Sequence, residues 1–313
     1  MFSLLENSIL KTIAYFDIFS RPLKEKEILD NLVVLPQNLS SAPTSEISIE
    51  FIKKEIENSQ YLPKFIEKKN DFYFLKGRED IIKERQKREK ISQRNWQKLE
   101  KIAKKINFAP FLKGVFVSGS LAINNSNEKS DIDLMIIAKK GRIFTVRFFL
   151  ISILDFIGER RTAQKKAGKI CLNHYLTDDN LEINFPSVYN AYTYLHLKPI
   201  INRGQVFENF RKENEWMKNY LLFWDKKFSS PFKIEYKSDL AKFLEKVFGG
   251  NFGNKLEEKL KKEQLKRKEK NYPEGVKNGR VILKDTLIEL HPNSPEKKIL
   301  KEYQKRLQRL SLS

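Results

Sequence analysis

Two polar clusters separate apolar runs in the middle of this chain, and their spacing restricts the fold more than any other feature. Residues 119–133 read GSLAINNSNEKSDID. The apolar run at residues 115–117 precedes the Gly-Ser pair, and a second apolar run at residues 134–137 follows the Asp-Ile-Asp triplet. Apolar runs bounded by polar turn residues are typical of buried strands. The segment therefore predicts two strands joined by a polar connection.

Asp131 and Asp133 place two carboxylates at the start of the second strand. Side chains alternate between the faces of a strand, so these acids share one face and Ile132 points to the other. Like charges beside an apolar run are tolerated when a cation lies between them, and Mg²⁺ prefers hard oxygen ligands. Gly119 lets the backbone approach a ligand closely, and Ser120 with its neighbouring N–H groups can bind phosphate oxygens, especially if a helix starts near Ser120. The pattern predicts a metal site beside a phosphate site.

The order of these motifs resembles the signature of the DNA polymerase β-like nucleotidyltransferase superfamily: an apolar strand, Gly-Ser, a spacer, then Asp-x-Asp on a second strand. The resemblance covers about residues 107–200 and implies an α+β fold with a mixed-sheet core. It also implies Mg²⁺-dependent transfer of a nucleoside monophosphate from a nucleoside triphosphate, such as ATP, to an acceptor hydroxyl. Asp131 and Asp133 would then be catalytic and would bind two Mg²⁺ ions, while Gly119 and Ser120 would bind the nucleotide.

Such enzymes usually carry a third carboxylate on a later strand, and the matching strand here contains no acid. In the strand-like run at residues 169–176, Asn173 is the residue best placed for that role. An amide oxygen binds Mg²⁺ weakly and cannot take the proton of the acceptor hydroxyl. Asp178, Asp179 and Glu182 are the alternatives, although their setting is typical of a turn or a helix start. A second function class therefore stays open: a regulatory protein that binds nucleotide or nucleic acid and has lost turnover.

Residues 1–78 are predicted to form a separate module. Helices are expected at residues 4–16, 25–32 and 50–59, with a polar linker at 36–45. Residues 65–75 are predicted to form a hairpin that turns at Lys69-Asn70-Asp71.

Three helices followed by a hairpin resemble a winged helix, a fold that binds duplex DNA through one helix and the wing. In that case four lysines would contact the nucleic-acid backbone: Lys53, Lys54, Lys68 and Lys69. The alternative is a winged helix used for protein contacts.

The remaining segments are predicted to be mainly helical. Residues 79–106 are expected to form a connecting helix with one apolar face on the sheet. Residues 143–158 are apolar but shorter than the roughly twenty residues of a bilayer span, so they predict a helix that covers the sheet, and no membrane contact. Residues 201–313 are expected to be a mainly helical C-terminal region with a short extended piece at residues 281–290.

Two segments leave alternatives open. The basic stretch at residues 255–270 either follows nucleic-acid phosphates or forms a solvated helix, because acids are interspersed among its lysines. The tyrosines at residues 189–194 either stack on a base or pack in the core.

Sixty Lys and Arg residues against forty Asp and Glu give a formal net charge of +20. This excess attracts polyanions, so nucleic acid is the leading macromolecular partner and a protein acceptor is the other candidate. The alternative origin of the charge is a Lys-rich proteome.

A single cysteine excludes an internal disulfide, and the three histidines show no metal-ligand spacing and are expected to be structural. The N-terminal residues lack the basic region of a signal peptide, so a cytoplasmic location is predicted.

Overall fold

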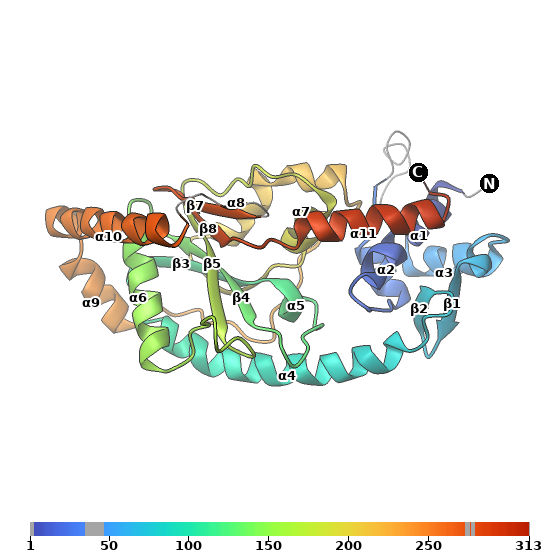
Figure 1. Ribbon diagram of the computed structural model, residues 1–313, viewed down its shortest axis with the longest axis horizontal. Coiled ribbons are helices and arrows are strands. Elements are labelled where there is room, and N and C mark those ends of the chain that lie inside the picture. The colour runs from blue at the N-terminus through green and yellow to red at the C-terminus, as the bar shows by residue number, and fades with distance from the viewer. Residues whose placement is uncertain (1–2, 35–46, 273–275, 277–278, 313) are drawn as a thin grey trace.

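The computed structural model describes residues 3–34, 47–272, 276 and 279–312, and the polar linker expected at residues 36–45 lies outside them. Figure 1 shows an elongated molecule with an N-terminal module at one end and a larger part built on a β-sheet at the other. Two long helices, α4 (Ile81–Ile106) and α11 (Glu296–Arg309), run between the two parts along opposite edges of the view.

Three helices and a hairpin form the N-terminal module, in the predicted order. The elements are α1 (Leu4–Asp17), α2 (Glu25–Asp30), α3 (Ile49–Asn58), the 3₁₀ helix η2 (Leu62–Lys64), β1 (Ile66–Lys69) and β2 (Phe72–Leu75). The hairpin turns through Asn70 and Asp71, whose φ values of +50° and +62° suit a tight turn between antiparallel strands. The predicted hairpin is therefore confirmed, while the assignment as a winged helix stays a prediction.

Helix α4 connects the module to the sheet and packs its apolar stripe on one sheet face, as expected for residues 79–106. The buried stripe shares a core with strand residues and consists of Trp96, Leu99, Ile102, Ala103 and Ile106. The helix forms because these apolar positions recur at helical spacing between charged residues.

Six strands form one mixed sheet with the order β6-β3-β4-β5-β8-β7. Their bounds are β3 (Leu112–Val117), β4 (Ile132–Ala138), β5 (Ile170–Thr177), β6 (Lys198–Asn202), β7 (Arg280–Leu283) and β8 (Leu287–His291). Strands β4 and β5 run parallel, and the other neighbouring pairs are antiparallel. The mixed sheet predicted for the core is confirmed.

Strands β7 and β8 come from the expected C-terminal region, and they extend the central sheet instead of forming a separate piece. Strand β8 pairs with β5, with His174 opposite Glu289. The pattern at residues 281–290 indicated only an extended segment, because the side chains of β7 are all half-buried and carry little periodic signal. Its partner strand is set by tertiary pairing, which local sequence does not encode.

Helices cover both faces of the sheet. One face packs against α4, α5 (Gly119–Ala122) and α6 (Ile143–Phe156), and the other against α7 (Val188–Leu195) and α8 (Val206–Glu213). Helix α6 covers the sheet as predicted for residues 143–158. The chain continues through the 3₁₀ helix η3 (Glu215–Asn219), α9 (Asp239–Val247) and α10 (Gly250–Asn271), which packs against α6. Within the described ranges, no helix is both long enough and apolar enough to cross a bilayer.

A buried acid on α10 caps the N-terminus of α6. Glu257 Oε1 accepts a hydrogen bond from the Phe144 N–H (2.9 Å), and Oε2 accepts from the Thr145 N–H (2.8 Å) and the Thr145 hydroxyl (2.5 Å). The N-cap residue Arg142 makes no side-chain capping bond. Glu257 therefore satisfies two of the free N–H groups that begin every helix, and its negative charge favours that helix end. The prediction of a solvated basic helix holds for most of α10 but not at this residue.

The Glu257→Ala variant is expected to lose about 2 kcal/mol of stability, because it leaves two buried N–H groups without acceptors. Urea denaturation followed by circular dichroism measures the loss. Glu258→Ala is the matched control, since Glu258 is exposed on the same helix, and it should change stability by less than about 0.5 kcal/mol. Equal effects of the two substitutions would contradict the capping role.

Candidate active site

The two predicted acids lie side by side at the start of β4. Their carboxylate oxygens and the Cys171 sulfur all lie within 4.8 Å of one another, and Ile132 is buried in the opposite layer. Asp131 also forms an ion pair with Arg161, whose Nε lies 2.6 Å from Asp131 Oδ2. The shared face inferred from strand alternation is therefore present.

Burial and repulsion set the electrostatics of this pair. The pKa of Asp133 is raised to about 6, first by burial and then by the negative charge of Asp131. The charge of His291, a hydrogen bond from Cys171 and the charge of Arg161 act in the opposite direction. A cation between the two carboxylates would remove the repulsion, which is the arrangement expected of a metal site.

Position 119 requires glycine because the backbone there lies against the Asp133 carboxylate. Its φ is +64°, and a Cβ placed on it would lie 2.6 Å from Asp133 Oδ2. The Ser118 N–H donates to the Asp133 carbonyl (3.0 Å), which holds the turn against β4. The expected helix begins at Gly119, although α5 is a single turn.

Ser120 occupies a different place from the one expected for a phosphate ligand. Its hydroxyl lies 3.4 Å from the Ser126 hydroxyl. Ser118 and Gly119 line the cavity beside the two acids, whereas Ser120 is not among its described lining residues. Nucleotide binding by Ser120 stays a prediction.

A β-bulge in β5 determines which groups occupy the third position beside the acids. Asp133 pairs with Cys171 and Met135 pairs with His174, so β5 contains one residue more than β4 over this interval. Cys171 therefore faces the carboxylates directly, while Asn173 Nδ2 donates to Asp133 Oδ1 over 3.5 Å. Burial raises the pKa of the Cys171 thiol. The third position thus holds a thiol and an amide, and the role of Asn173 there stays a prediction.

The alternative acids lie at the other end of β5. The Asp178 N–H donates to the Ala138 carbonyl, and Ala138 is about 16 Å along β4 from Asp133 at about 3.3 Å per residue. Asp178 Oδ1 accepts from the Lys140 N–H (2.7 Å), and Asp179 forms an ion pair with Lys140 (2.9 Å). Glu182 lines a separate cavity. None of the three lines the cavity that contains the two carboxylates.

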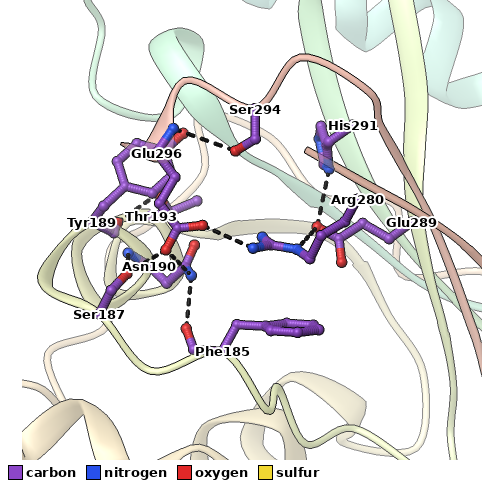
Figure 2. A network of polar contacts seen from close by, with 10 residues as sticks. All are labelled: Phe185, Ser187, Tyr189, Asn190, Thr193, Arg280, Glu289, His291, Ser294 and Glu296. Atoms are coloured by element: carbon purple, nitrogen blue, oxygen red, sulfur yellow. Dashed lines mark hydrogen bonds and ion pairs between the residues drawn. The ribbon is translucent and has the colours of Figure 1, made fainter. Parts of the chain in front are cut away.

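The two acids open into a cavity of about 350 Å³ whose far wall comes from the C-terminal part of the chain. Figure 2 shows this wall, which contains Arg280 on β7, Glu289 and His291 on β8, and Tyr189 on α7. Of these residues, Tyr189 was among the tyrosines predicted either to stack on a base or to pack in the core, and His291 was expected to be structural. Arg280 and Glu289 were missed in the sequence, although Glu289 and His291 repeat the i, i+2 spacing of Asp131 and Asp133. Of the neighbouring tyrosines, Tyr192 and Tyr194 are buried in the core, and Tyr189 is half-buried.

Residues 96–176 match the nucleotidyltransferase domain family. The match runs from the second half of α4 through β5 and includes Gly119, both aspartates, Cys171 and Asn173. No curated protein and no solved structure matches this chain.

The nucleotidyltransferase domain indicates a transferase of nucleoside monophosphates, and the Asp-Asp-Cys cluster is its candidate metal site. The cavity wall formed by β7 and β8 lies outside the matched residues.

Proposed function

We propose that this protein transfers a nucleoside monophosphate from a nucleoside triphosphate to an acceptor hydroxyl in a reaction that requires Mg²⁺. The observation that carries the proposal is the pair Asp131 and Asp133 against Gly119 in one cavity, within the nucleotidyltransferase domain.

The donor set fits a divalent cation that prefers oxygen. Two carboxylates lie together, and the raised pKa of Asp133 reflects first its burial and then the repulsion from Asp131, which a cation would relieve. Mg²⁺ commonly binds one or two carboxylates and completes its shell with water and substrate phosphates. When bound, two Mg²⁺ ions would neutralise phosphate charge and lower the pKa of the acceptor hydroxyl. Asp131 and Asp133 would hold them, since a protonated thiol at Cys171 is a poor ligand for Mg²⁺.

Arg161 is the cationic side chain best placed for the triphosphate. It lies on the cavity wall and already contacts Asp131. In contrast, three basic residues near the start of α6 are engaged elsewhere: Arg142 donates to Asn254, Arg147 donates to Gln264, and Lys140 pairs with Asp179. Arg161 would therefore orient phosphate oxygens at the mouth of the cavity.

The acceptor is proposed to be a nucleic acid, with a protein as the alternative, and the protein is proposed to act in the cytoplasm. The net charge of +20 supports a polyanionic acceptor. Three of the four lysines expected to contact nucleic acid are paired with acids in the N-terminal module: Lys53 with Glu57, Lys68 with Glu25, and Lys69 with Glu79. Lys54 is exposed. Nucleic-acid contact by this module would therefore require exchange of these ion pairs.

A second candidate function is a regulatory protein that binds nucleotide or nucleic acid without turnover. The occupation of the third position by Cys171 and Asn173 favours it, because neither group can act as the missing carboxylate.

The test is incorporation of label from α-³²P ATP, CTP, GTP and UTP with Mg²⁺, using total RNA and cell lysate as acceptors. Transfer by the wild type that Asp131→Ala/Asp133→Ala abolishes would establish the enzyme and the class of acceptor. Absence of transfer together with Mg²⁺-dependent nucleotide binding would favour the regulator. Absence of both would refute the site.

A further inference from the structure

A buried carboxylate and a histidine on β8 form a pair that faces the active-site cavity. His291 Nδ1 lies 3.3 Å from Glu289 Oε1, and both residues line the cavity with Asp131 and Asp133. Glu289 is only 2% exposed, and its pKa is lowered to about 2 despite burial, through the hydrogen bond with His291 and the charges of His174 and Arg280. The carboxylate is therefore ionised and can only accept a hydrogen bond.

The carboxylate of Glu289 is held by a network that Figure 2 shows from close by. Arg280 Nε donates to Glu289 Oε1 (2.7 Å), and Arg280 Nη1 donates to Glu296 Oε2 (2.8 Å). The guanidinium also stacks on the Phe185 ring at 4.3 Å from its centroid. Glu296 is in turn bound by the Ser187 hydroxyl (2.7 Å) and the Asn190 amide (3.0 Å). Residues from β7, α7, α11 and the segment before α7 thus fix the position of the Glu289 carboxylate.

This network fixes the tautomer of His291. In the neutral imidazole, the nitrogen beside ionised Glu289, Nδ1, carries the proton, and Nε2 carries the lone pair. A histidine oriented in this way by a carboxylate is the common arrangement for a side chain that accepts a proton through Nε2.

Strand pairing brings His291 to the face of the sheet that carries the acids. Met135 on β4 pairs with His174 on β5, which pairs with Glu289 on β8, so these three residues share one face of the sheet. Asp133 lies two residues from Met135 and His291 lies two residues from Glu289, and residues two apart on a strand point to the same face. Asp133 and His291 therefore belong to that face. Both side chains line the same cavity. The His174 ring lies 6.3 Å from the His291 ring. Burial lowers the pKa of His174 to about 4, so His174 is neutral near pH 7.

The proposed transfer needs a group that takes the proton of the attacking hydroxyl. The Asn173 amide has no basic nitrogen for it, whereas the His291 imidazole lines the same cavity and has one. We propose that His291 is the proton acceptor of this reaction and that Glu289 is its positioning residue. This inference rests on the proposed function.

The atoms of the step balance without a further reactant. The acceptor oxygen forms a bond to the α-phosphorus while its proton moves to His291 Nε2. The bond from the α-phosphorus to the oxygen bridging to the β-phosphorus breaks, and pyrophosphate leaves with the electron pair. The proton then passes from His291 to solvent.

The charged and titratable groups around His291 are Glu289 on β8, Arg280 on β7, His174 on β5, Asp133 on β4, Tyr189 on α7 and Glu296 on α11. Because Asp133 has a pKa of about 6, the part of the pH dependence assigned to His291 is the difference between the wild type and a variant that changes only this imidazole.

The test uses the full chain with the four α-³²P nucleoside triphosphates and total RNA under single-turnover conditions. The rate with His291→Ala is expected to fall about 100-fold and to recover partly on addition of imidazole. Binding of α,β-methylene ATP with Mg²⁺, measured by calorimetry, is expected to be unchanged. The rate of the wild type should rise with pH more steeply than the rate of His291→Ala, which keeps only the pH dependence contributed by Asp133.

Two further variants keep the test interpretable. His291→Gln keeps a donor to Glu289 but no proton-accepting nitrogen, so it should be as slow as His291→Ala even if the alanine variant folds poorly. Glu289→Gln should give a smaller decrease with an altered pH profile. Lys298→Ala, an exposed position on α11, is the control and should keep the rate of the wild type.

The outcomes separate the two proposals. An active wild type whose rate is undiminished in both His291 variants overturns the role of His291 and leaves the proposed function intact. A wild type that transfers no label to any acceptor refutes the proposed function, and the role of His291 with it.

Discussion

The Asp133→Asn variant is expected to be more stable than the wild type in metal-free buffer at pH 8 while losing transfer by at least about 100-fold. Burial and Asp131 raise the pKa of Asp133 to about 6, so its ionised form disfavours the folded state. A raised acid pKa contributes stability below the unfolded value near 4, and that contribution is lost as pH rises through about 6. The gain from asparagine should be about 1–3 kcal/mol at pH 8 and should disappear near pH 4.

Thermal melting in EDTA at the two pH values measures this gain. Asp285→Asn removes a charge from a side chain that is 67% exposed and is the matched control; it should leave the melting temperature nearly unchanged. Added Mg²⁺ should stabilise the wild type more than Asp133→Asn, because the variant has lost one proposed ligand. A variant that is less stable than the wild type at pH 8 would contradict the electrostatic account.

The Gly119→Ala variant is expected to lose transfer by about 100-fold or more, together with about 1–3 kcal/mol of stability. A Cβ at this position would lie 2.6 Å from Asp133 Oδ2, so the carboxylate must move away from its place beside Asp131. A displacement of about 1 Å at a reacting centre is sufficient for a loss of this size. Steady-state transfer rates and urea denaturation measure the two effects.

The Gly77→Ala variant is the control that separates the effect of backbone strain at positive φ from the effect of the steric clash with Asp133. Gly77 has a φ of +78°, but a Cβ there would have no atom within 4 Å. Gly77→Ala should therefore lose stability as Gly119→Ala does and keep the transfer rate of the wild type. If Gly119→Ala kept full activity, the close approach to Asp133 would have no role in the site.

Local patterns were sufficient for features whose physical cause is local. The shared face of Asp131 and Asp133 follows from strand alternation, and the turn at Asn70 and Asp71 follows from residues that tolerate positive φ. The apolar run at residues 143–158 predicted α6 because its length suits a buried helix and is too short for a bilayer. In each case the determining residues are close together in the chain.

Features that depend on pairing between distant segments required the tertiary structure. The bulge in β5, which places Cys171 opposite Asp133, arises from the register between β4 and β5. Uniform alternation does not reveal such an extra residue, so the sequence indicated Asn173 for the third position, with Asp178, Asp179 and Glu182 as alternatives, and did not indicate Cys171. Bulges near active sites redirect side chains in this way.

By itself the sequence determined the nucleotide-site motif, because the Gly-Ser turn and the two carboxylates are separated by a short connection and obey strand geometry. Only the tertiary structure decided which residues form the cavity wall opposite the two carboxylates. Glu289 and His291 lie more than a hundred residues further along the chain, and their short strand has no periodic signal strong enough to name its partner. Hydrogen bonding between β5 and β8, and the contacts of Arg280 with Glu289 and Glu296, bring that strand to the cavity.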